Sequence, residues 1–170
     1  MRTLIALAGL CVVLATAGCN KTQSGSPSSS STTLSDSELW DPCALPDSAV
    51  KATGVDPSSK DTNPFSGPRS GWKGCAWNND SYFLNVNSTS HTMAEVRANA
   101  SLKNIHDVEL TGRQAVSYTE QGNGCGVDFP TPKGVVEIII VLAGVSNPSA
   151  ESVCPVALKT ANSLNSSIPK

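Results

Sequence analysis

The stretch that decides the fold is VVEIIIVL, residues 135–142 of a 170-residue chain. Alternate side chains of an extended strand point to opposite faces of a sheet. One face of this strand is wholly apolar and consists of Val136, Ile138, Ile140 and Leu142. The other face is apolar apart from Glu137. A strand that is apolar on both faces has to be covered on both, so we predict that it is central in the sheet.

Other strands and helices can be placed around this segment. Strands are predicted over residues 73–78, 81–88, 112–119 and 126–129, with turns at residues 79–80 and 123–124. Helices are predicted over residues 41–53, 92–104 and 147–164, the second of them opened by a capping box of Thr92 and Glu95. Residues 56–71 are rich in Pro, Gly, Ser and Asp and are predicted to form a loop. The order is α-β-β-α-β-β-β-α, which predicts an α+β fold with a mainly antiparallel sheet of about five strands packed by helices.

Composition limits the class of protein. The chain has 12 basic and 14 acidic residues, a net charge of −2, and 39% hydrophobic residues. This balance lacks the basic excess of a nucleic-acid-binding protein, and the apolar content is enough for a folded core.

The N-terminus has the features of an export signal. Arg2 precedes an uncharged apolar run from residue 4 to residue 17, which is short for a membrane span and typical of a signal-peptide core. Thr16-Ala17-Gly18-Cys19 resembles a bacterial lipobox, although Thr16 stands where that pattern usually has Leu or Val. The resemblance implies that residues 1–18 are removed and that Cys19 carries a diacylglyceryl anchor. The alternative is cleavage by the ordinary signal peptidase, which would leave Cys19 unmodified.

A polar segment separates this signal from the folded domain. Residues 20–37 contain eight serines and almost no apolar side chains, so they cannot repay the entropy of ordering. We therefore expect residues 19–37 to be a lipidated cysteine followed by a flexible tether, and residues 38–170 to form one globular domain.

Four cysteines remain in the predicted domain, namely Cys43, Cys75, Cys125 and Cys154. In an oxidising compartment an even set of this kind indicates disulfides. Three pairings are possible, and we favour Cys43–Cys75 with Cys125–Cys154 because each bond then joins neighbouring structural units. A zinc site is the rival interpretation, but no CxxC pair is present and we expect no metal or cofactor.

The context of the cysteines resembles a known family. The sequence has DPCAL at residues 41–45, CAW at 75–77, GRQAV at 112–116 before CGV at 125–127, and CPVA at 154–157. Together, behind the lipobox-like segment, these motifs resemble the actinobacterial lipoproteins grouped as domain of unknown function 3558, over about residues 38–169. More distantly the chain resembles the extracellular sensor domain of an actinobacterial serine/threonine kinase. The resemblance implies a membrane-anchored envelope lipoprotein with two local disulfides, and it carries no catalytic or ligand residues.

The residues with chemical potential do not form a catalytic motif. GxSxG and HExxH are both missing, and we expect His91 and His106 to lie on the surface at a helix start and in a turn. We expect Trp77 to pack on a disulfide, Trp40 or Trp72 to line a binding surface if one exists, and Arg113 to pair with a carboxylate.

These observations predict a non-enzymatic binding or interaction module on the outer face of the cell membrane, anchored through Cys19. It would bind an envelope protein or ligand and no nucleic acid. The alternative is a carrier of a small apolar molecule or lipid in a cavity between sheet and helix. An enzyme is the third possibility. The sequence predicts no oligomeric state.

Overall fold

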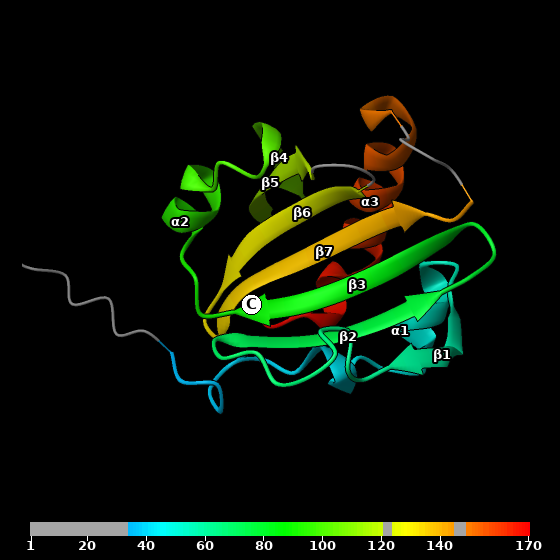
Figure 1. Ribbon diagram of the computed structural model, residues 1–170, viewed down its shortest axis with the longest axis horizontal. Coiled ribbons are helices and arrows are strands. Elements are labelled where there is room, and N and C mark those ends of the chain that lie inside the picture. The colour runs from blue at the N-terminus through cyan, green and yellow to red at the C-terminus, as the bar shows by residue number, and fades with distance from the viewer. Residues whose placement is uncertain (1–33, 121–123, 145–148) are drawn as a thin grey trace, which may run out of the picture. The chain divides into compact units, whose positions relative to one another are not determined.

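The computed structural model describes residues 34–120, 124–144 and 149–170. The strands of these residues form a seven-stranded antiparallel sheet in the order β1-β2-β3-β7-β6-β5-β4 (Figure 1). In chain order they are β1 (Asp56–Asp61), β2 (Trp72–Asn78), β3 (Tyr82–Thr89), β4 (Lys103–Leu110), β5 (Arg113–Thr119), β6 (Gly124–Thr131) and β7 (Gly134–Leu142). The α-helices are α1 (Asp47–Ala52), α2 (Met93–Ala98) and α3 (Ala150–Leu164), and the 3₁₀ helices are η1 (Pro42–Ala44) and η2 (Asn165–Ser167).

The apolar strand β7 occupies the centre of the sheet, as predicted, between β3 and β6. Val136, Ile138 and Ile140 are fully buried on the face that α3 covers. On α3 itself Ala157 and Ala161 are completely buried, and their small side chains bring the helix close to the sheet. This layer between sheet and α3 contains most of the hydrophobic core.

The α+β class and the antiparallel arrangement are confirmed, but five strands was too few. The structure adds the two edge strands, β1 within the segment predicted to be a loop and β4 within the segment predicted to be helix and turn. β1 has the sequence DPSSKD, with no large apolar residue to mark it as a strand. In β4 the alternation is broken by a bulge near Asn104, whose φ is 53°.

Two predicted helices are shorter than expected. The helix predicted over residues 41–53 is divided into η1 and α1, because Leu45 precedes Pro46 and takes an extended conformation (φ −56°, ψ 131°). Helix α2 begins with the predicted capping box of Thr92 and Glu95 but ends at Ala98, where Asn99 turns extended. No helix within residues 34–120, 124–144 and 149–170 is long and apolar enough to cross a membrane.

Some predictions concern other residues. The signal peptide, Cys19, the tether up to residue 33, part of the turn at 123–124 and the helix start at 147–148 lie outside the described residues. Within the last part of the expected tether, the Asp36 carboxylate accepts a hydrogen bond from the backbone N–H of Gly71 at 2.7 Å. Contacts of the domain therefore begin at least two residues before residue 38.

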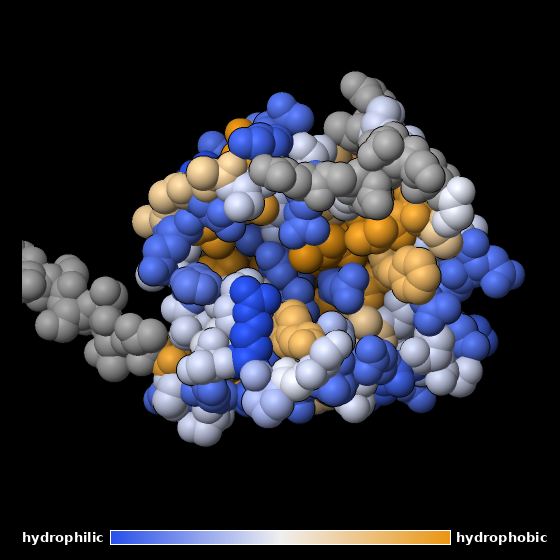
Figure 2. Space-filling view, in the orientation of Figure 1, coloured by the Kyte–Doolittle hydropathy of each residue, from blue (hydrophilic) through white to orange (hydrophobic). Residues whose placement is uncertain are grey.

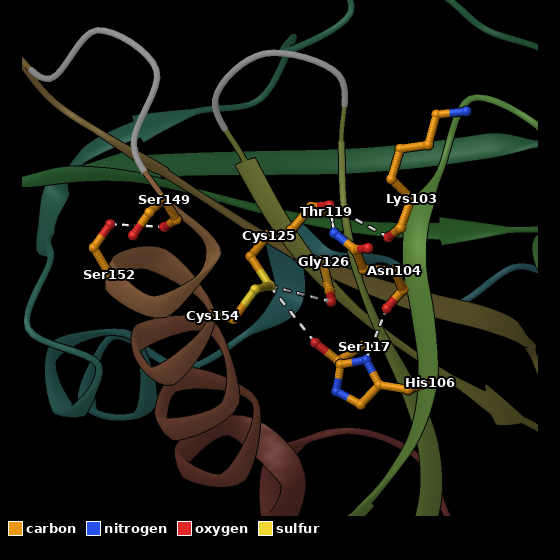
Figure 3. Close-up of a disulfide and its surroundings, with 10 residues drawn as sticks. All are labelled: Lys103, Asn104, His106, Ser117, Thr119, Cys125, Gly126, Ser149, Ser152 and Cys154. Atoms are coloured by element: carbon orange, nitrogen blue, oxygen red, sulfur yellow. Dashed lines mark hydrogen bonds between the residues drawn. A yellow bond between two sulfur atoms is a disulfide. The ribbon is translucent and has the colours of Figure 1, made fainter.

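Two disulfides join elements that are neighbours in space, with the favoured pairing. Cys43–Cys75 ties η1 to β2, and Cys125–Cys154 ties β6 to α3. Figure 3 shows the second bond at the junction of helix and sheet, where the Ser117 hydroxyl lies 3.6 Å from the Cys125 sulfur. The two bonds therefore attach η1 and α3 covalently to strands of the sheet.

Replacing Cys43 and Cys75 together by alanine should lower the free energy of unfolding by about 3–4 kcal/mol, since the bond closes a loop of about 30 residues. Denaturant unfolding with and without reductant measures this difference. Wild-type protein in reductant should fall at least as far, because it loses both bonds. A double variant as stable as the oxidised wild type would contradict the assignment, as would a Cys43–Cys154 peptide in a non-reducing digest.

Candidate functional site

The face of the sheet opposite α3 carries a row of polar side chains across its three central strands. Glu137 on β7 lies in register with Asn87 on β3 and with Asp128 on β6. Strand β7 pairs with both β3 and β6. Asn87 and Asp128 therefore point from the same face of the sheet as Glu137, although they lie 50 and 9 positions from it along the chain. The Asn87 side-chain amide donates a hydrogen bond to Glu137 Oε2 at 2.7 Å.

Tyr118 on β5 closes the row. Its hydroxyl lies 2.9 Å from Asp128 Oδ1 and 3.0 Å from Glu137 Oε1. The tyrosine ring crosses Gly126 on β6, where a Cβ atom would collide with the ring. Glycine at this position therefore lets the phenol reach both carboxyl groups.

The two contacts of the Tyr118 hydroxyl are both hydrogen bonds when the two carboxyl groups retain one proton between them. The phenol has one hydrogen, so it can donate to only one of its two carboxyl partners. The other contact is a hydrogen bond only if that carboxyl group is protonated and donates to the phenol oxygen. Burial raises the pKa of Asp128 well above its usual range, and the charge of Glu137 adds to the shift. Burial also raises the pKa of Glu137, although the hydrogen bonds from Asn87 and Tyr118 oppose it.

The surroundings of the pair are acidic. Asp128 is only 2% exposed, and no described basic group lies within ion-pair distance of it. Glu120 lies near the same cluster, where burial, and then the charge of Glu137, raises its pKa. Arg69 and His91 bring positive charge close enough to lower the pKa of Glu137, but neither forms an ion pair with it.

Two adjoining cavities open above this row, and we call them together the acidic hollow. One, of about 280 Å³, lies beside α2 and is bounded by Asp128, Glu137, Val96 and His91. The other, of about 300 Å³, lies over the centre of the sheet and is bounded by Asn87, Glu137, Glu120 and Ile139. Arg69, Trp72, Asn99, Leu102 and Glu137 line both.

The walls of the acidic hollow come from α2 and from the loop between β1 and β2. Val96 of α2 packs with Val116 and Tyr118, which fixes the helix over one end of this face. On the other side Phe65 lies over Gly74, where a Cβ atom would come within 2.9 Å of its ring. The missing side chain of Gly74 on β2 thus leaves room for Phe65 of the loop, just as the missing side chain of Gly126 on β6 leaves room for the Tyr118 ring.

Aromatic rings and one guanidinium form the rim. The ring of Trp72 meets Phe65 and His91 edge to face, with centroids 6.1 and 5.6 Å apart. The Arg69 guanidinium carbon stands 4.3 Å from the Trp72 ring centroid and 5.5 Å from that of Phe65. In Figure 2 hydrophilic atoms stand beside apolar ones at the middle of this face, and a larger apolar area lies over the end of β7 near α3.

The tryptophans, histidines and arginine considered in the sequence analysis lie in different parts of the domain, some where expected and some elsewhere. Trp77 is buried in the core beside Cys75, and Trp72 lines the acidic hollow. His91 stands at the start of α2 as expected, whereas His106 lies on β4 and not in a turn. Among the residues that the structure describes, no carboxylate forms an ion pair with Arg113. Arg113 instead donates to the backbone oxygen of Pro169 at 2.9 Å and stacks on Phe129.

The central residues of the site were not predicted. Asn87, Tyr118 and Asp128 are far apart in the sequence, and strand register alone brings them to Glu137. The usable signal was Glu137 itself, a charge in the middle of an otherwise apolar strand. Within the part of the chain that the structure describes, no three His, Cys, Asp or Glu side chains form a group able to hold a metal ion.

Comparison with known proteins gives the family. A family model described as "Protein of unknown function (DUF3558)" matches residues 14–166, which is most of the chain. The chain belongs to this family. No curated protein and no solved structure matches it.

Asp128→Asn should change how stability depends on pH. Because the folded-state pKa of Asp128 is raised above its unfolded value of about 3.9, the native protein binds the proton more tightly than the unfolded chain. The stability linked to this group is complete below the unfolded pKa and is lost as pH rises through the folded pKa. The variant should thus gain stability relative to wild type as pH rises above about 4, by up to about 1.4 kcal/mol per unit between the two pKa values.

Urea unfolding at pH 3.5, 5, 6 and 7 measures the effect, with Asp80→Asn in the exposed β2–β3 turn as the matched control. A constant difference between Asp128→Asn and wild type across this range would show that Asp128 ionises normally.

Proposed function

We propose that this protein is a non-enzymatic, lipid-anchored binding module of the bacterial envelope, which holds a ligand or a group of a partner protein in the acidic hollow. The observation that carries the proposal is a partly enclosed polar cavity pair built on the rigid centre of the sheet. Its floor is fixed by strand pairing on both sides of β7, and its rim belongs to a loop and a short helix. A fixed floor with adaptable walls suits recognition of a ligand.

Anchoring agrees with this arrangement. A diacylglyceryl group on Cys19 and a serine-rich tether would place the domain outside the membrane with the hollow free to meet its ligand. The tether would span about 20–25 Å if it behaves as a flexible chain. The proposed cell-membrane location rests on the lipobox-like residues 16–19, and the proposed actinobacterial origin rests on the cysteine motifs that resemble the actinobacterial lipoproteins.

The carrier of an apolar molecule is the second candidate, and the packing favours it less. The space between sheet and α3 holds completely buried side chains such as Phe129, Ile138 and Leu164. The two cavities of the acidic hollow lie on the opposite face of the sheet. Native mass spectrometry of protein purified from membranes separates the two: a co-purified lipid supports the carrier.

Site-specific photocrosslinking in the native envelope tests the binding module. A photoreactive residue at Asn99, an exposed position on the wall of the hollow, should give an adduct that Trp72→Ala abolishes. The same probe at Lys159, exposed on α3, should give none. Equal adducts at both positions, or an adduct insensitive to Trp72→Ala, would contradict recognition through the hollow. A turnover assay in which activity disappears with His91→Ala would replace the binding module by an enzyme.

Cys19→Ala should move the protein from the membrane pellet to the soluble fraction, because the thioether that anchors it can no longer form. Cys11→Ala, within the segment expected to be removed, is the matched control and should remain in the pellet. Immunoblotting of fractionated cells measures both. Retention of Cys19→Ala in the membrane would contradict the anchor.

A further inference from the structure

We propose that the acidic hollow binds an organic cation, a primary ammonium or a guanidinium group, held between the carboxyl groups of Asp128 and Glu137 and the ring of Trp72. This inference rests on the proposed function and names the chemical class of the ligand. Three features of the hollow support it: a buried acceptor without a donor, an excess of carboxyl groups, and an aromatic wall that already holds Arg69.

Within the described ranges of the chain, the base of the hollow holds a buried acid without an ion-pair partner and a buried acceptor without a hydrogen-bond donor. Asp128 is 2% exposed with no ion-pair partner among the described residues. Asn87 is 4% exposed, and while its amide nitrogen donates to Glu137, its Oδ1 has no hydrogen-bond donor. That oxygen lies over Gly74, next to the Phe65 ring that walls the central cavity. Buried acceptors of this kind are costly unless a donor reaches them.

The balance of charged side chains around the hollow indicates that the ligand is a cation. Glu120 and Glu137 line the central cavity, Asp128 joins Glu137 in the cavity beside α2, and Glu95 stands at its edge. The facing basic groups are Arg69 and His91. Carboxyl groups therefore outnumber basic groups around the hollow, and a donor-rich cation satisfies them with charge-assisted hydrogen bonds.

The aromatic wall favours an organic cation. A cation within about 6 Å of an indole centroid is attracted by the ring face. The Arg69 guanidinium already stacks at 4.3 Å from the centroid of Trp72, which shows that this wall accepts a planar cation. Arg69 belongs to the exposed loop and forms no ion pair with the acids. Its charge competes with an incoming cation for the same carboxyl groups.

Calorimetric titration of the detergent-solubilised full-length protein at pH 7.5 tests the inference, with butylguanidinium and butylammonium as probes and butyrate and butanol as matched controls. At least one of the two cations should bind saturably, and the controls should not bind. Glu137→Gln should weaken cation binding at least fivefold, whereas Glu109→Gln, exposed on β4, should not change it. Arg69→Gln should strengthen cation binding at least threefold, because it removes a competing charge.

The direction of the Arg69 effect separates this site from an anion site. Butyrate binding that Arg69→Gln abolishes would overturn the inference, and so would cation binding that Glu137→Gln leaves unchanged or the failure of both cations to bind. Binding of Ca²⁺ in place of the organic cations would overturn it as well. If these results appear while crosslinking from Asn99 still depends on Trp72, the binding module stands and only the ligand class is wrong.

Discussion

The arrangement of the domain depends on one constraint: an acidic side chain lies in the middle of the most apolar strand. Glu137 could be placed toward α3 only at the cost of burying a charge in the core. The pleat instead turns it to the opposite face, where Asn87 and Tyr118 donate hydrogen bonds to it and Tyr118 also contacts Asp128. That face cannot be closed by an apolar helix over the same spot, so α2 covers one end and the β1–β2 loop another, and the acidic hollow remains between them.

A second buried acid, Asp128, lies next to Glu137. Asp128 faces Glu137 directly across the β6–β7 pair, and both pKa values are raised by burial. Both contacts of the phenol are satisfied when the pair retains one proton, and our proposal is that a bound cation takes the place of that proton. Burial makes the pair costly for folding, and acids with perturbed pKa values are frequent at functional sites, which supports the proposal of a ligand that brings positive charge and donors.

Sequence reasoning reached the parts of the fold that depend on local patterns. The continuous apolar run gave the central strand, Thr92 and Glu95 marked the start of α2, and cysteine spacing gave the disulfides of the structure. It failed at the edges, because β1 buries almost nothing and β4 is interrupted by a bulge. The site was out of reach for another reason: its residues meet through the register of β3, β5, β6 and β7, and no spacing in the chain encodes that register. Glu137 was visible only as an interruption of the apolar pattern.

The ionisation of one pair of carboxyl groups, those of Asp128 and Glu137, is expected to set the chemistry of the open face. Carbon-13 NMR of the side-chain carboxyl groups of Asp128 and Glu137, recorded as a function of pH and assigned by their Asn and Gln variants, measures this directly. The two signals should titrate together, and the pair should retain one proton above the pH at which exposed carboxyl groups have ionised, about 3.9–4.3. Two independent titrations within that ordinary range would contradict the shared proton and, with it, the interpretation of the hollow as a site that exchanges a proton for a cation.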